Sequence, residues 1–314
     1  MHERAYAAWS RIWFSPGDAR TLAAVRIVVA GHALWILLSR DLSALASLPA
    51  PFWNGVTAAA RARFMIAPGH PALEGLLGGT TVVALVAAVL GLWPRVSCLV
   101  AGLLLYHLAP LETIILTPSP YVKGFTVAVP ALVVLSFVPC ADAWSVRRAG
   151  AALADAWEYR WPVQLVRLFV AQIYIFSGWA KLVQVGLNWV AADNVRAWLY
   201  LLNQRDQNVV YNTVGPWLAE RPTLCLLVGV FTLVLELSFA LTLFWGPARR
   251  VLPVVAATWH AGILFAMNIA FPYVPLLLVF ADWSVRGQRR DAVTCKCVVP
   301  ELKHLSTTIT PQRR

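Results

Sequence analysis

The chain has 314 residues and a mass of 34.5 kDa, and 59% of its residues are hydrophobic while only 13% are charged. Soluble domains average about 45–50% apolar and about 25% charged residues, so this composition excludes a soluble domain, a disordered chain and a coiled coil. The net charge of +11 is typical of the basic cytoplasmic loops of a polytopic membrane protein. We therefore expect the lipid bilayer, and not nucleic acid, as the main partner.

A bilayer core about 30 Å thick requires about 17–25 apolar residues for each helical span. The chain offers eight such stretches, at residues 21–38, 73–92, 96–116, 124–138, 161–185, 224–245, 251–269 and 273–283. The fourth and the last are short, so a bundle of seven spans remains an alternative. The sequence predicts an all-α transmembrane bundle of about eight spans, whose first helix is not a cleaved signal peptide.

Basic residues indicate how these spans are oriented. Of the 26 Lys and Arg residues, 16 fall in segments that eight spans place inside, 7 fall in outside loops and three lie within spans. This bias predicts a multi-pass protein of the cell membrane with both termini in the cytoplasm. It divides the chain into a cytoplasmic segment (1–20), a transmembrane domain (21–285) and a basic cytoplasmic tail (286–314).

Two predicted external loops, at residues 41–71 and 186–223, are longer than a connection requires. Their Trp, Tyr and Leu residues favour short interfacial helices over disorder. In the tail, Cys295 and Cys297 form a weak metal or redox signal, because no second pair accompanies them. We predict no metal site, and five cysteines without framework spacing argue against a disulfide scaffold.

Three ionisable residues fall near the middle of the bilayer. At 1.5 Å per residue, His107 lies roughly 16 Å into the third span, Glu236 roughly 18 Å into the sixth and His260 roughly 14 Å into the seventh. A charge at this depth is costly unless it is paired, so each of these residues is a functional candidate. Structural hydrogen bonding between helices remains an equally good interpretation.

Lys181 lies about 20 residues into the fifth span, roughly 30 Å across the bilayer towards the outer face. A lysine at this level either extends its amine to the lipid headgroups or turns it into the bundle. In an apolar pocket, a desolvated lysine can act as a base near neutral pH. Arg26 and Arg167 lie a turn or two inside the opposite interface, where snorkelling or pairing is expected.

The residues around Lys181 resemble a known family. The run from Gln172 to Leu182, QIYIFSGWAKL, is followed by Trp189 and is similar to the Tyr-x-x-x-Gly-x-x-Lys-Leu signature of the HTTM family. That family comprises vitamin K-dependent gamma-carboxylase and its bacterial relatives. Further matches follow in the expected order, at residues 93–98, 139–146, 236–239, 260 and 271–273, so that the resemblance extends over residues 20–285.

The resemblance implies a specific chemistry. In the carboxylase, the lysine that matches Lys181 deprotonates a reduced quinone, which reacts with oxygen to give a strong base that removes a glutamyl proton before carbon dioxide adds. The residues alone leave open whether the protein is an enzyme and which cofactor it uses. If it is an enzyme, the resemblance implies a carboxylase-like or epoxidase-like lyase with a lysine base and a reduced quinone such as menaquinol as its cofactor. The predicted catalytic residues are Lys181, His260 and Glu236, and the predicted quinol-binding residues are Tyr174, Tyr121, Trp189 and His107.

Two departures from the carboxylase pattern affect the choice of substrate. Residues 118–121 read Pro-Ser-Pro-Tyr where the carboxylase has an Asn-His-x-Tyr stretch. The carboxylase also carries a large lumenal domain that binds its substrate, whereas we expect the polar residues 286–314 to lie in the cytoplasm. These departures favour quinol-linked modification or maturation of a secreted peptide over carboxylation of a docked protein. The alternative is a non-catalytic protein, either a transporter with Glu236 and His260 on a polar pathway or a scaffold for a peptide-processing partner.

Overall fold

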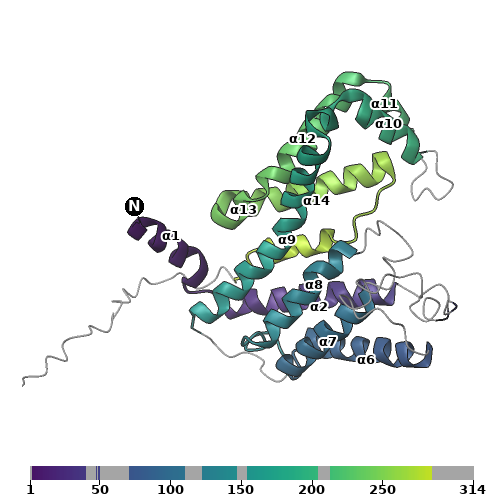
Figure 1. The fold of residues 1–314 in the computed structure, drawn as a ribbon. Coiled ribbons are helices and arrows are strands. Elements are labelled where there is room, and N and C mark those ends of the chain that lie inside the picture. The colour runs from purple at the N-terminus through teal and green to yellow at the C-terminus, as the bar shows by residue number, and fades with distance from the viewer. Residues whose placement is uncertain are drawn as a thin grey trace, which may run out of the picture. The chain divides into compact units, whose positions relative to one another are not determined.

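The structure, a computed structural model, describes residues 2–39, 47, 49, 71–109, 122–146, 154–203 and 213–284. Every regular element in these residues is a helix, apart from isolated bridge residues such as the pair Gly17 and Ala156 (Figure 1). The all-α fold that the sequence predicts is therefore confirmed. The basic tail with Cys295 and Cys297, Tyr121 and nearly all of the first long loop lie outside the described residues.

Seven of the eight expected stretches form α-helices. Five helices are long and apolar enough to cross a membrane: α2 (Ala19–Leu38), α6 (Pro71–Leu90), α9 (Trp157–Gln184), α12 (Pro222–Ser238), which is extended by α13 (Leu241–Phe244), and α14 (Gly246–Met267). Two shorter apolar helices are α7 (Pro94–Leu108) and α8 (Val122–Ser136), each about 22 Å long. An amphipathic helix, α1 (His2–Phe14), precedes them.

Helix α2 lies in the core and packs against α6, α8 and α9. Its alanines leave room for close contact, because Ala23, Ala30 and Ala33 are fully buried. Helices α6, α7 and α8 pack against one another in chain order, and α9 packs against α12. The last of these contacts positions the site described below.

The eighth stretch differs from the expected α-helix. Residues Val274–Phe280 form a seven-residue 3-10 helix, η3, which rises only about 14 Å. Pro272 and Pro275 favour the difference, because each proline lacks the N–H that an α-helix requires beyond its first turn. Prolines are tolerated inside the longer helices α8, α9 and α14, but too few apolar residues follow Pro275 to build a span. The prediction of an α-helical span at residues 273–283 is therefore wrong in its geometry.

This irregular segment nevertheless runs through the bundle, with α2, α9 and α14 around it. Near its start, Nε2 of His32 donates to the carbonyl of Pro272 at 2.8 Å, and near its end, Nε of Arg167 donates to the carbonyl of Val279 at 2.9 Å. Non-helical backbone is tolerated at membrane depth only where protein groups satisfy it. Buried polar side chains therefore replace the missing helical hydrogen bonds.

Arg26 and Arg167 are both buried, with 0% and 4% of their surface exposed, so they pair inside the protein and do not snorkel to lipid. Arg26 donates to the carbonyls of Cys140 at 2.7 Å and Trp144 at 2.6 Å, in the turns that follow α8. Each arginine thus holds a segment that lacks a regular helix against a spanning helix. Of the two roles expected for Arg26 and Arg167, snorkelling to the interface or pairing inside the protein, the structure shows pairing.

The second long loop contains short helices, as its composition predicted. They are η2 (Gly186–Val190), α10 (Ala192–Asn203) and α11 (Val214–Ala219). A side chain at Gly229 of α12 would meet the backbone of Val190 at 2.9 Å, so η2 lies directly on α12. Asn203 donates to the carbonyl of Ala266 at 2.8 Å and accepts from Asn268 at 3.1 Å, which ties α10 to the end of α14.

The path of residues 268–284 through the bundle leads to the first prediction. In a variant with Cys295 and Cys297 replaced by Ser, we introduce Asp193→Cys or Asp282→Cys, both at exposed positions. Asp193 lies in α10, whose Asn203 is hydrogen-bonded to Asn268 at the start of the segment, and Asp282 lies at the segment's other end. A membrane-impermeant maleimide should label the cysteine at position 193 in whole cells and the cysteine at position 282 in inverted vesicles. Labelling of both from the same side would contradict a crossing by residues 268–284.

Candidate functional site

Helices α9 and α12 meet closely where Gly178 faces Glu236. A Cβ atom at Gly178 would lie 3.1 Å from Cβ of Glu236 and 3.0 Å from Cδ2 of Leu237. A larger residue here would press on the side chains of Glu236 and Leu237, so glycine lets the two helices approach closely. Lys181 follows Gly178 by three residues, which brings its side chain to the same face of α9, towards α12.

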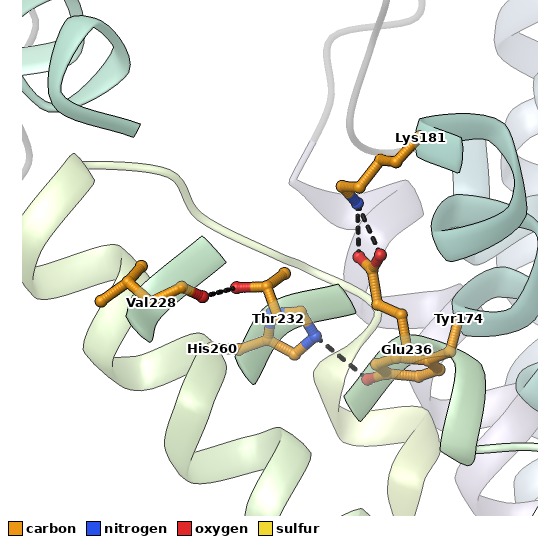
Figure 2. A network of polar contacts seen from close by, with 6 residues as sticks. All are labelled: Tyr174, Lys181, Val228, Thr232, Glu236 and His260. Atoms are coloured by element: carbon orange, nitrogen blue, oxygen red, sulfur yellow. Dashed lines mark hydrogen bonds and ion pairs between the residues drawn. The ribbon is translucent and has the colours of Figure 1, made fainter. Parts of the chain in front are cut away.

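Lys181 and Glu236 form an ion pair across this contact. Nζ of Lys181 donates to Oε1 and Oε2 of Glu236 at 2.6 Å and 2.7 Å, as Figure 2 shows. The two side chains are only 21% and 14% exposed. The amine of Lys181 thus turns into the bundle and not towards the headgroups. The ring of Trp189, in η2, lies 4.8 Å from the same nitrogen and adds a cation–π contact.

The ion pair forms part of the wall of a cavity of about 330 Å³ between α9, α10, α12, α14 and the segment before η3. Its volume is at the lower end of the range of about 300–1,000 Å³ that small-molecule sites occupy. Most of the lining is apolar or aromatic, and the polar groups are few, as is usual for ligand sites. The aromatic lining residues are Tyr174, Trp189, Trp198, Trp259, Phe271 and Tyr273.

A second pair of polar side chains also lines this cavity. Nε2 of His260, on α14, is 3.1 Å from the hydroxyl oxygen of Tyr174, on α9 (Figure 2). The ring of Tyr174 stacks on Phe239 with a centroid distance of 4.1 Å, which fixes its orientation. Tyr273 contacts both Tyr174 and His260 edge to face. The histidine and the tyrosine therefore form a preoriented hydrogen-bonding pair among aromatic rings.

The structure brings together five of the seven residues that the sequence singled out. Lys181, Glu236, His260, Tyr174 and Trp189 all line this cavity. His107 is not among the lining residues: its Nε2 atom lies 3.2 Å from both carboxylate oxygens of Glu74, between α7 and α6. Tyr121 lies outside the described residues.

Sequence reasoning missed two residues. Glu74 is 1% exposed and pairs with His107. In the sequence it was marked only by its acidic character near the start of an apolar stretch. Asn194 lines the cavity, and its Nδ2 donates to the carbonyl of Trp189 at 2.7 Å, which holds η2 in place beside Lys181. An asparagine in a long polar loop carries no signal of this role before the loop is folded.

Among the described residues, no group of three or more His, Cys, Asp or Glu side chains is arranged to hold a metal ion. The titratable groups in the cavity wall are an amine, a carboxylate, an imidazole and the phenols of Tyr174 and Tyr273, and Ser177, Asn194 and Thr232 add hydroxyl and amide groups. These groups can donate, accept and transfer protons to a small ligand. These side chains therefore provide acid–base chemistry and hydrogen bonding.

The helical fold and the intramembrane ion pair define a polytopic membrane protein with a ligand-sized cavity between its helices. The family to which it belongs follows from a comparison with family models, in which the HTTM domain matches residues 14–283. Because this match covers most of the chain, the protein belongs to the HTTM family. Searches of the curated proteins and of the solved structures found no match.

The close contact at Gly178 leads to the second prediction. Gly178→Val should lower the thermal unfolding midpoint of the purified protein, because its added atoms collide with Glu236 and Leu237, at a cost of about 1–3 kcal/mol. The matched control is Gly262→Ala on α14, where a Cβ meets nothing within 4 Å and a neutral or slightly stabilising effect is expected. Equal midpoints for the two variants would mean that α9 and α12 do not meet at Gly178.

Proposed function

We propose that this HTTM protein binds a lipid-soluble ring compound with a hydroxyl group in the cavity, and that Lys181 and Glu236 move a proton at that hydroxyl. A reduced quinone fits this description. The observation that carries the proposal is the ion pair with N–O distances of 2.6 and 2.7 Å in the wall of a cavity of about 330 Å³.

The ion pair suits a neutral ligand that enters from the membrane. Because the charges of Lys181 and Glu236 compensate each other, the cavity presents no net charge from this pair to an apolar molecule. In an ammonium–carboxylate pair only the carboxylate can take up a proton, so Glu236 accepts the proton from the ligand hydroxyl while Lys181 stays hydrogen-bonded to it. The cationic partner then stabilises the negative charge that develops on the ligand oxygen.

The rest of the lining supports the choice of an aromatic ligand. The rings of Trp189, Trp198 and Phe271 offer flat apolar surfaces against which a second ring can stack. His260 and Tyr174 provide a further donor and acceptor for the ligand's other oxygen. When bound, a reduced quinone would supply the electrons for a reaction with oxygen, as the family resemblance implies.

The size of the cavity limits how a peptide, the proposed second substrate, can bind. A volume of about 330 Å³ accommodates a ring system but not a folded peptide. A peptide substrate would therefore present a single side chain at the rim, beneath the short helices of the loop at residues 186–223. Maturation of a secreted peptide remains the proposed context, and it requires no large docking domain.

The third prediction tests the ion pair directly. Lys181→Ala, Lys181→Arg and Glu236→Gln should each reduce quinol epoxidation in isolated membranes by about a hundredfold or more, the usual contribution of a positioned acid or base. Lys181→Arg keeps the positive charge but removes the amine, and Glu236→Gln keeps the shape of the side chain but removes its charge. Turnover is measured with menaquinol and dissolved oxygen, by chromatography of the extracted quinone species.

The matched control is Val183→Ala, two residues further along α9, where the side chain is 64% exposed and does not line the cavity. It should turn over quinol like the unmodified protein. If the Lys181 and Glu236 variants are as active as Val183→Ala, the proposed proton transfer by the ion pair is wrong.

A further inference from the structure

A second group of charged residues lies far from the cavity, where the first turns of α9 and α14 meet α13. Arg160 and Arg167 lie on α9 and Arg249 lies in the first turn of α14. Gln164 and Arg249 donate to the same carbonyl, that of Leu243, at 3.3 and 3.0 Å, and Arg167 donates to Oε1 of Gln164 at 3.1 Å. Arg160 precedes Gln164 by one helical turn and shares its face.

The hydrogen-bond partners of these arginines are neutral. Nε of Arg160 donates to the carbonyl of Ile12 at 3.3 Å, and Nε of Arg249 donates to the carbonyl of Thr242 at 2.9 Å. Among the described residues, no carboxylate lies within ion-pair distance of any of the three guanidinium groups. A guanidinium has five N–H donors, so both Arg160 and Arg249 keep donors for a further acceptor.

The local charge balance is positive. The charges of Arg160 and Arg249 repel each other, and both act on Arg167. Asp282 is the acidic residue whose charge acts on Arg167, but its carboxylate also accepts a hydrogen bond from the hydroxyl of Ser284 at 2.6 Å. Glu158 lies in the first turn of α9, while α14 has no acidic residue in its first turn.

The ends of the helices add to this positive potential. Both α9 and α14 begin here, and the N-terminal end of a helix carries a partial positive charge that favours anions. Exposed aromatic side chains surround the group: Trp157 is 51% exposed, Phe244 62% and Trp245 57%. Aromatic residues of this kind mark the level of the lipid headgroups.

We propose that Arg160 and Arg249 bind the phosphate of an anionic phospholipid, with its acyl chains against Phe244 and Trp245. The distribution of Lys and Arg predicts that this end of the bundle faces the cytoplasm, and anionic lipids of the cytoplasmic leaflet bind basic pockets between helices. The site is independent of the cavity, because 21 residues of α9, about 30 Å, separate Arg160 from Lys181.

The test is native mass spectrometry of the protein released from nanodiscs that contain equal amounts of phosphatidylglycerol and phosphatidylcholine. The unmodified protein should retain phosphatidylglycerol preferentially, and Arg160→Gln with Arg249→Gln should weaken that retention about tenfold or more. The control is Arg95→Gln, which removes an exposed arginine from the first turn of α7 and should leave retention unchanged.

Arg249 also donates to two backbone carbonyls, so its loss can destabilise the fold. The single variant Arg160→Gln therefore separates loss of lipid binding from loss of stability. It should keep the unfolding midpoint and still lose about fivefold in lipid retention, while Arg160→Lys recovers part of it. Retention equal to that of Arg95→Gln, or no preference for phosphatidylglycerol, would overturn the proposal. Displacement of the lipid by millimolar inorganic phosphate would also overturn it, because the site would then recognise a free anion.

Discussion

The ion pair between Lys181 and Glu236 is the interaction on which the rest of the site depends. A single charge inside a membrane bundle is costly, so each of these residues is tolerable because the other is present. The pair requires α9 and α12 to touch, and Gly178 permits that contact. Trp189 is held beside the amine by Asn194, so the loop that follows α9 contributes to the same environment.

A similar constraint explains the two buried arginines. Where the chain is not α-helical, its carbonyls need donors, and Arg26 and Arg167 supply them to the turns after α8 and to η3. The irregular last segment can therefore run between helices and place Phe271 and Tyr273 in the cavity wall. Buried polar side chains thus stabilise a bundle in which one segment is too short for a helical span.

The sequence predicted much of this arrangement, because apolar length is a direct physical requirement of the bilayer. Seven helices follow from it, and a Glu and a His at membrane depth were recognised as candidates on the cost of their burial alone. The direction of the Lys181 side chain did not follow, because a lysine near a helix end is equally satisfied by headgroups. The geometry of residues 273–283 depended on prolines whose effect is decided by the surrounding helices.

Pairing across long separations was the least predictable feature. Lys181 and Glu236 are 55 residues apart, and His107 and Glu74 are 33 apart, so no local periodicity links them. Depth alone placed His107 at the level of the other polar residues, yet it lies with Glu74 between α6 and α7. The position of a residue along a span predicts its level in the membrane but not the face of the helix on which its side chain lies.

The most direct test of the central claim is a double-mutant cycle on the free energy of unfolding, with Lys181→Met, Glu236→Met and both together. Removing one partner of a buried pair leaves a charge without compensation, whereas replacing both with apolar residues is often neutral. Each single variant should therefore be less stable than the double variant. Single effects that simply add in the double variant would contradict an ion pair that holds α9 and α12 together.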